Sequence, residues 1–533
     1  MVRTLRSRQS TFQYRSTSGE ISCKLRYRLR IVTVVPADSA TSSMMPRAST
    51  VRVATRNRPQ HLSQVLAALA VSLGPFAAGL GKGYSSPAIA SLQEQQQQQQ
   101  RLPGGAGSAH NATGIFTVSA QQASWVASLS LLGALFGGML GGLAMRFGRK
   151  RVLLLTSLPF SASWLVTVFA SSVEMMFATA FVGGFCCAIV LLVTQVYISE
   201  ISVPDIRGCL SAVLKIVGHI GTLISFAVGA YLDWRQLAMV VAVAPIMLFA
   251  TVMYVPETPS FLVLAGRDEE AARSLQWLRG PGIDIGHELA TIRTNILASK
   301  QNQETRRNAY AIMYTKLTRP ILTTCGLMLF QRFSGANAFN FYAVSIFRQT
   351  FGGMNPHGGA VAVAFVQLLA SLLSGLLIDT VGRLPLLIAS SMFMSMALAG
   401  FGSFAYYEDV HRGRGGFSHM GLSPQHDWIP LLCVLVFTVA FSLGISPISW
   451  LLIGELFPLE YRELGTSLAT SFSYVCAFVG VKTFVDFQQH LGLHGTFWLY
   501  AAISVGGLCF VVCCVPETKG RDLDEMHPKY TQA

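Results

Sequence analysis

The tetrapeptide Val-Pro-Glu-Thr occurs twice in this chain, as VPETPSFL at 255–262 and as VPETKGRDL at 515–523. Each copy closes a long apolar run. The copies start 260 residues apart (515 − 255), about half of the 533-residue chain. A repeat at this spacing indicates a chain made of two similar halves.

The composition excludes an ordinary soluble protein. Hydrophobic residues make up 51% of the chain and charged residues only 12%, whereas about a quarter of the residues in soluble domains are charged. The sequence therefore predicts an all-α membrane protein.

The apolar runs set the number of helices, because about 20 apolar residues span the hydrocarbon core of a bilayer. Eight runs carry no formally charged residue: 123–145, 152–173, 175–199, 236–256, 358–378, 384–407, 428–454 and 495–515. Four more carry isolated basic residues: 62–92, 208–232, 320–347 and 464–485. Together they predict twelve transmembrane helices in two pseudo-symmetric halves of six.

The charges predict the orientation in the membrane. RFGRKR at 146–151 has four cations and no acid, which favours a cytosolic loop. Counting from there, both termini and the connection 257–319 are cytosolic, and GRDEEAARSLQWLRG within that connection predicts a surface helix. The loop 93–122 is then extracellular, with a disordered glutamine run and a glycosylation acceptor at Asn111.

These boundaries divide the chain into five segments. Residues 1–58 hold twelve Lys and Arg against Glu20 and Asp38, which is typical of a cytosolic tail, with a transit-like segment as the alternative. The predicted segments are a disordered basic tail, a first six-helix bundle, a helical linker, a second six-helix bundle and a C-terminal tail: 1–61, 62–256, 257–319, 320–515 and 516–533.

Two further motif pairs are in register with the first. GGLAMRFGRK (141–150) corresponds to GLLIDTVGRLP (375–385), and YISEISVPDIRG (197–208) corresponds to IGELFPLEYRELG (453–465). Two parallel six-helix halves are typical of carriers that rock about a central site. The repeated charges predict a reversible cytosolic gate, with simple anchoring of the helix ends as the alternative. The gate residues are Arg149, Glu200, Arg207, Arg383, Glu455 and Arg462.

Taken together, residues 62–525 resemble the sugar porters of the major facilitator superfamily, and among them the insect facilitated trehalose and glucose transporters. The resemblance rests on these motifs and on PETPSFL, FQRFSGANAFNFY, PISW, GELFP and PETKG. It implies alternating access, uncoupled passage of a sugar, and a place in the plasma membrane.

The resemblance also implies a substrate cavity. Gln331 and Asn337 match family positions that hydrogen-bond sugar hydroxyls, and Trp450 matches a tryptophan that covers the sugar. Asn340, Tyr342 and Gln367 are further candidates. Packing between helices is the alternative for each of these side chains.

Several cations depart from the family pattern: Lys82, Lys215 and Arg332, with His219 one turn after Lys215. A cation near the bilayer centre costs at least about 2.5–3.5 kcal/mol, and the twelve runs contain no Asp or Glu. Three interpretations stay open. In the first, Lys82, Lys215 and Arg332 make the pocket suitable for an anionic sugar or organic anion. In the second, the cations reach water or carbonyls around a neutral sugar. In the third, the chain is a non-transporting sensor.

Other function classes find no support in the residues. Residues 62–92 lack the carboxylate with which proton-coupled relatives carry a proton, so the sequence predicts uniport. Nucleotide-binding, hydrolase and metal-ligand motifs are missing. We therefore expect no enzyme activity, cofactor, metal or nucleic-acid binding. The expected partners are a small sugar and the lipid bilayer, and the sequence indicates no protein partner.

Overall fold

The computed structural model describes residues 62–101, 118–281, 283–305, 310–351, 353–414, 427–457 and 462–517. The predicted tail 1–61, the acceptor Asn111, the side chain of Arg462 and residues 518–533 lie outside what is described. Every helix described below belongs to the unit 57–533.

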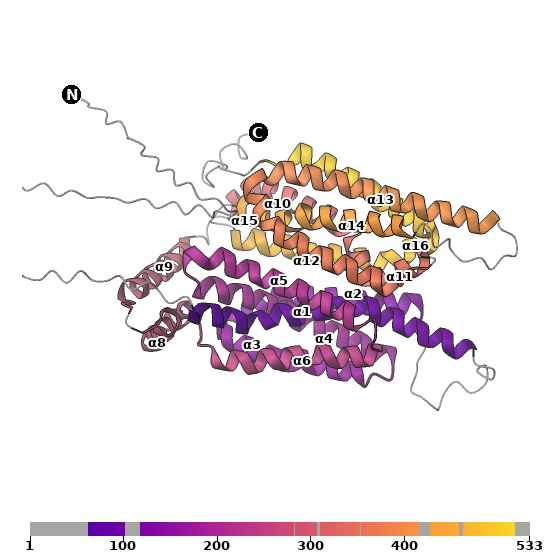
Figure 1. The fold of residues 1–533 in the computed structure, drawn as a ribbon. Coiled ribbons are helices and arrows are strands. Elements are labelled where there is room, and N and C mark those ends of the chain that lie inside the picture. The colour runs from indigo at the N-terminus through magenta and orange to yellow at the C-terminus, as the bar shows by residue number, and fades with distance from the viewer. Residues whose placement is uncertain are drawn as a thin grey trace, which may run out of the picture. The chain divides into compact units, whose positions relative to one another are not determined.

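The described residues of the first half form six long helices, drawn in indigo to magenta in Figure 1. They are α1 (Leu62–Arg101), α2 (Ala120–Ala144), α3 (Arg149–Val168), α4 (Val173–Ile201), α5 (Pro204–Val228) and α6 (Trp234–Tyr254), with a single 3-10 turn, η1 (Met145–Phe147), between α2 and α3. Helix α1 packs against α5 and α6, and α4 packs against α2 and α3.

The second half, orange to yellow in Figure 1, contains interrupted helices. Its elements are α10 (Tyr310–Phe333), α11 (Ala336–Thr350), α12 (Pro356–Val381), α13 (Arg383–Arg414), α14 (Trp428–Leu443), α15 (Ile445–Leu456) and α16 (Arg462–Cys514). Gly335, with φ 87°, separates α10 from α11, and Gly444 separates α14 from α15.

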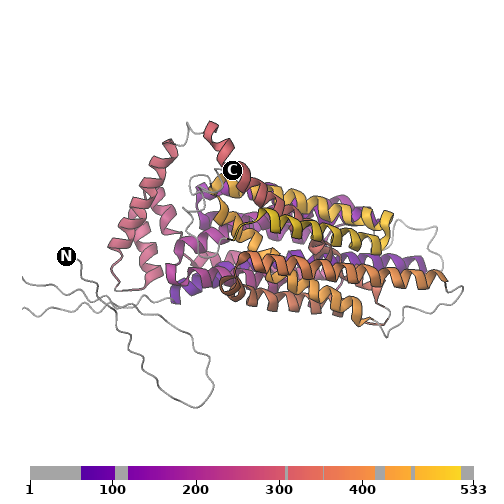
Figure 2. The same cartoon turned by 90° about the horizontal axis from the view of Figure 1, so that it is seen from above.

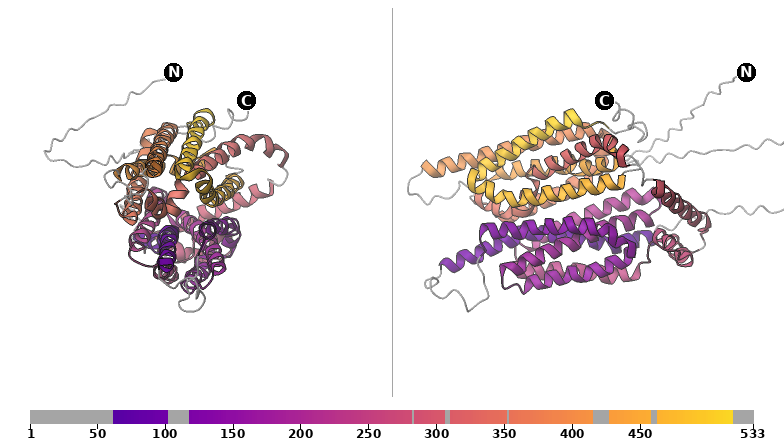
Figure 3. Two further views of the ribbon diagram at one scale, coloured as in Figure 1. Left: turned by 90° about the vertical axis from the view of Figure 1, so that its right-hand side faces the viewer. Right: turned by 180° about the vertical axis from the view of Figure 1, so that it is seen from behind.

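The predicted number of spans agrees with these elements. In the described part of the chain, ten stretches are long and apolar enough to cross a membrane. One of them is α16, in which Gly492 has φ 73° and ψ 173°, so it consists of two helices. Helices α10 and α11 together form the remaining span. The two halves lie side by side when the bundle is seen end-on (Figure 3, left).

The linker helices mark one end of the bundle. Helices α7 (Pro259–Leu264), α8 (Asp268–Arg279) and α9 (Gly286–Thr305) follow the first half, and α8 and α9 lie beyond the helix ends in Figures 1 and 2. We call this the linker end and the other the far end. Helix α8 confirms the predicted surface helix, because it buries Ala271, Leu275 and Leu278 on one face.

The outer surface of the bundle is apolar, as a lipid-facing surface must be. Leu155 on α3 is 69% exposed and Leu376 on α12 is 71% exposed. The interior is packed instead with fully buried side chains such as Phe160 and Tyr197.

One local expectation was wrong. The glutamine run at 95–100 continues α1 as helix up to Arg101 and is not disordered. Glutamine is a good helix former, and the Gln95 side chain accepts a hydrogen bond from Trp234 Nε1 of α6 at 3.1 Å.

Candidate functional site

The repeated tetrapeptide caps a helix in each half. The Glu257 carboxylate accepts hydrogen bonds from the backbone N–H groups of Arg149 (2.9 Å) and Lys150 (3.0 Å) in the first turn of α3. The Glu517 carboxylate accepts from Arg383 (3.2 Å) and Leu384 (2.8 Å) at the start of α13. A carboxylate at a helix N-terminus satisfies free N–H groups and complements the helix dipole. The repeat therefore ties the end of each half to one of its own internal helices.

An arginine next to each cap forms an ion pair within the same half. Arg149 pairs with Glu200 at 2.7 Å and Arg383 pairs with Glu455 at 3.1 Å. Arg207 instead donates to the carbonyl of Ser202 at 3.3 Å. The pairs related by the repeat thus occupy equivalent places at the linker end, and each joins helices of a single half.

Gln331 lies at the break between α10 and α11. Its side chain is 97% buried, being 3% exposed, and its Nε2 donates to the carbonyl of Ser446 at 3.1 Å. Its Oε1 is buried and has no hydrogen-bond partner among the described residues. A buried carbonyl oxygen without a donor is costly, so this atom is a ready acceptor for a ligand hydroxyl.

Arg332 and Trp450 are neighbours across the second half. The Arg332 guanidinium donates to the hydroxyl of Ser473 at 2.8 Å and lies 5.8 Å from the centroid of the Trp450 ring. Trp450 is nevertheless 37% exposed. Part of its indole is therefore open to a ligand, and Arg332 already has an acceptor and an aromatic face.

The other cations come from the first half. Lys82 on α1 and Lys215 on α5 are both exposed. Lys82 lies close enough to Arg332 for the two charges to repel, and His219 lies close to Lys82 and Lys215. Neither lysine side chain is enclosed by protein, and a long cationic side chain that extends toward water lowers the cost of its charge at membrane depth.

The remaining predicted residues are less closely grouped. Asn337 Nδ2 donates to the carbonyl of Arg332 at 3.4 Å, and Asn340 Nδ2 donates to the carbonyl of Ala336 at 2.9 Å, so both support the break near Gly335. Gln367 is half-buried on α12. Tyr342 packs on Phe484 with ring centroids 4.9 Å apart and lines a separate cavity described below.

The far end is closed by contacts between the halves. Lys482 Nζ donates to Gln121 Oε1 at 2.8 Å and lies 5.1 Å from the Trp125 ring centroid. The N–H of Val344 donates to Ser86 Oγ at 3.0 Å. An ion pair between Arg348 and Glu94 joins α11 to α1. The polar contacts found between described residues of the two halves lie at this end.

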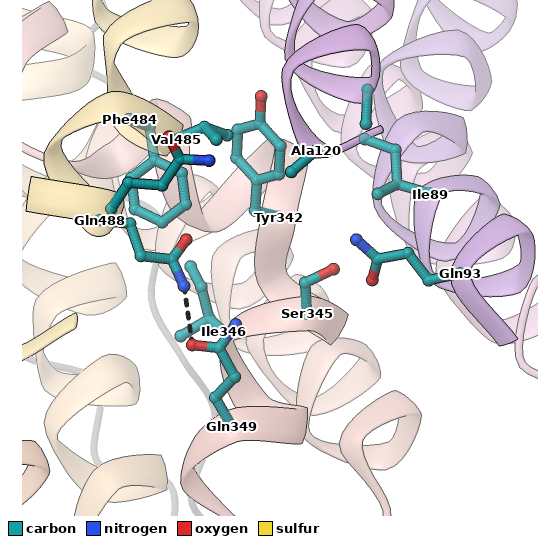
Figure 4. A pocket seen from close by; sticks show the side chains of 12 residues that line it. Ile89, Gln93, Ala120, Tyr342, Ser345, Ile346, Gln349, Phe484, Val485 and Gln488 are labelled. Carbon is teal, nitrogen blue, oxygen red and sulfur yellow. Dashed lines mark hydrogen bonds between the residues drawn. The ribbon is translucent and has the colours of Figure 1, made fainter. Parts of the chain in front are cut away.

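A cavity of about 250 Å³ lies among these far-end contacts. Figure 4 shows its wall, which is formed by α1 and α2 of the first half and by α11 and α16 of the second. No sequence motif predicts this cavity or the far-end contacts. Their only signal is a set of glutamines near helix ends in both halves, and such residues are common there.

Comparisons with known proteins agree with this architecture. The profile of the family described as "Sugar (and other) transporter" matches residues 67–530. The chain is 35% identical over 481 residues to the facilitated trehalose transporter Tret1 of Apis mellifera ligustica, covering 89% of each chain. It is 37% identical over 471 residues to Tret1 of Culex quinquefasciatus, covering 88% of this chain and 86% of the relative.

Solved structures show the same fold. The inward-open xylose transporter XylE from E. coli superimposes with a TM-score of 0.69 at 21% identity, over 87% of this chain and 99% of XylE. A partially occluded inward-open form gives a TM-score of 0.67, over 86% of this chain and 100% of that one. The fold is therefore that of the major facilitator superfamily, as predicted.

Proposed function

Because the chain belongs to the sugar transporter family, we propose that it carries a neutral sugar such as trehalose or glucose down its gradient by alternating access. Membership also makes it a multi-pass membrane carrier and not an enzyme. The relatives above are facilitated trehalose transporters, which supports trehalose as the first substrate to test.

Two observations in the second half carry the proposal: a buried acceptor without a partner among the described residues and a partly exposed aromatic face. Gln331 Oε1 is buried without a partner among the described residues, and Trp450 on the same half remains partly exposed. A sugar supplies a hydroxyl to the first and an apolar ring face to the second. We propose that Asn337, Asn340 and Gln367 add further amide contacts as the halves close, and that Tyr342 acts near the far end.

The cations are compatible with a neutral substrate. Arg332 has Ser473 and Trp450 as partners, while the Lys82 and Lys215 side chains are not enclosed by protein. The charges therefore require no anionic cargo. Since α1 has no Asp or Glu within 62–92, we propose uniport without proton coupling.

Alternating access assigns the two ends. We propose that the linker end is cytosolic, so that the closed far end is extracellular and this conformation is open to the cytosol. The bundles 62–256 and 320–515 would then move as bodies. Arg149, Glu200, Arg383 and Glu455 hold each bundle together, and Arg207 and Arg462 bring the bundles together when the cytosolic side closes.

The same orientation places both termini in the cytosol and Asn111 outside the cell, in a protein of the plasma membrane. A glycosidase-sensitive shift in mass that is lost in Asn111→Gln supports this topology. Tags at both termini should be inaccessible in intact cells, and surface labelling of either tag refutes it.

Uptake measurements test the function. In cells that lack their own sugar carriers, we expect saturable uptake of labelled trehalose or glucose that a proton uncoupler does not change. Gln331→Leu and Trp450→Ala should each lower kcat/KM at least about tenfold, the equivalent of one buried hydrogen bond or one aromatic contact. Trp277→Ala is the matched control, because Trp277 is similarly exposed but lies on α8.

Two results would replace the proposal. Uptake of organic anions without sugar uptake supports the anion carrier. Surface delivery without any flux supports the sensor.

A further inference from the structure

The far-end cavity is built from both halves of the molecule. Ile89 and Gln93 of α1 and Ala120 and Ala123 of α2 face the second half across it. The opposite wall comes from α11, with Tyr342, Ser345 and Gln349, and from α16, with Phe484 and Gln488. A ligand in this space touches both halves at once.

The polar groups of the wall are neutral. None of the twelve described residues that line the cavity is charged. The charged residues Lys482 and Asp486 lie on α16, which forms part of the wall, but they do not line the cavity. Four glutamines supply amides that both donate and accept hydrogen bonds. This combination suits a neutral ligand with several hydroxyl groups better than an ion.

Two of these groups have unused bonding capacity. Ser345 Oγ is buried and has no partner among the described residues, and Gln93 points toward it from the first half in Figure 4. Gln488 Nε2 donates to Gln349 Oε1 at 2.7 Å, which leaves the Gln349 amide nitrogen available. Donors and acceptors therefore converge on the cavity from opposite sides.

An aromatic pair completes the wall. Tyr342 and Phe484 stack with an interplanar angle of 23°, and both line the cavity. Aromatic rings beside a few convergent polar groups are typical of small-molecule sites. The C–H face of a pyranose ring matches such a surface.

The volume of the cavity indicates the size of a ligand that fits inside it. A cavity of about 250 Å³ corresponds to roughly eight waters at ~30 Å³ each. A single hexose displaces fewer waters than this and a disaccharide displaces more. The space therefore has room for one monosaccharide ring.

We propose that this cavity is a second, monosaccharide-sized polyol site, distinct from the site at Gln331 and Trp450. The assignment of a sugar as the ligand of this site rests on the proposed function. Because its walls belong to different halves, the site is complete only while the far end is closed. A hexose that binds the far-end-closed conformation more tightly than the open one therefore stabilises the closed conformation by that difference in binding free energy. External hexose then slows the return of the empty carrier to the conformation in which the far end is open.

Equilibrium dialysis of the purified full-length protein with labelled glucose tests the site directly. The wild type should bind glucose at two sites, and Gln331→Leu should retain the far-end site. The double variant Gln93→Met/Ser345→Ala should weaken that site by about tenfold or more, since it removes two hydrogen-bonding groups. Ser403→Ala is the matched control, because Ser403 lies on α13 and bonds only the carbonyl of Ala399 among the described residues.

The outcomes separate this site from transport. If Gln331→Leu abolishes all glucose binding, or if Gln93→Met/Ser345→Ala binds at both sites like the wild type, the far-end site is refuted. A protein that binds glucose in Gln331→Leu but shows no uptake supports the site and refutes the proposed function. In transport assays, external glucose should lower the Vmax of trehalose uptake in the wild type and not in the double variant. A purely competitive pattern in the wild type also refutes the proposal.

Discussion

Removal of the Glu257 carboxylate should destabilise the first half through the cap of α3. The carboxylate accepts from the backbone N–H groups of Arg149 and Lys150 at 2.9 and 3.0 Å. Glu257→Ala leaves these donors without their acceptor and removes a negative charge from the positive end of the helix dipole. Loss of an N-terminal cap costs about 0.5–2 kcal/mol and loss of the dipole interaction about 0.3–2 kcal/mol. We therefore expect a loss of about 2–3 kcal/mol in the free energy of unfolding.

Thermal unfolding of the purified protein in detergent measures this loss. For a cooperative unit of 150–250 residues, 1 kcal/mol shifts Tm by about 2–4 °C. Glu257→Ala should thus lower Tm by about 4–12 °C, and Glu517→Ala should have a similar effect through α13. Glu257→Gln keeps an acceptor oxygen and should give a smaller shift.

Glu270→Ala provides the control. Glu270 pairs with Arg267 on the exposed start of α8, where both side chains are 41% exposed. Such a pair is worth about 0.3–0.5 kcal/mol, so Tm should fall by only about 1–2 °C. If Glu257→Ala has no larger effect than Glu270→Ala, the carboxylate does not hold α3 and the explanation of the repeat is wrong.

Three further changes test other parts of the structure. Gly148→Ala should lower Tm, because Gly148 has φ 108° and an added Cβ would lie 2.6 Å from the Glu257 carboxylate, whereas Gly142→Ala meets nothing within 4 Å and should be neutral or stabilising. Lys482→Gln weakens the far-end closure by about 1.5 kcal/mol, roughly tenfold in the conformational equilibrium; labelling of Ala123→Cys by an impermeant maleimide should accelerate, and an unchanged rate contradicts the assigned closure. Arg332→Gln removes a cation–π contact of about 0.5–1 kcal/mol with the Trp450 indole. Because the sugar then no longer competes with the guanidinium for this ring face, KM for the sugar should fall about threefold. A complete loss of uptake would instead favour an anionic substrate.

Much of the fold is available from the sequence because it depends on local and repeated patterns. The length of each apolar run predicts a span without reference to any other residue. The register of VPET, GRK or VGR, and the Glu-to-Arg motif predicts two equivalent halves. The surface helix α8 follows likewise from its own charge and apolar spacing.

The candidate site residues were predicted through the resemblance and not through geometry, and their role in binding stays a prediction. Gln331 and Arg332 lie on α10, and Trp450 lies on α15. The partner of Arg332 is Ser473, 141 residues away, and no local pattern predicts such a pair. The extension of α1 through the glutamine run was missed because composition suggested disorder, while helix propensity and the contact with Trp234 favour helix.

The sequence by itself determined a membrane-embedded, duplicated bundle of twelve spans with charges at repeated helix ends. Hydropathy and sequence register are sufficient for this, since the bilayer requires each span to satisfy its own backbone hydrogen bonds. Only the tertiary structure decided what Glu257 and Glu517 bind, which end of the bundle is closed, and where the far-end cavity lies. These features depend on side chains from distant parts of the chain meeting in space, and such meetings are fixed by how the helices pack.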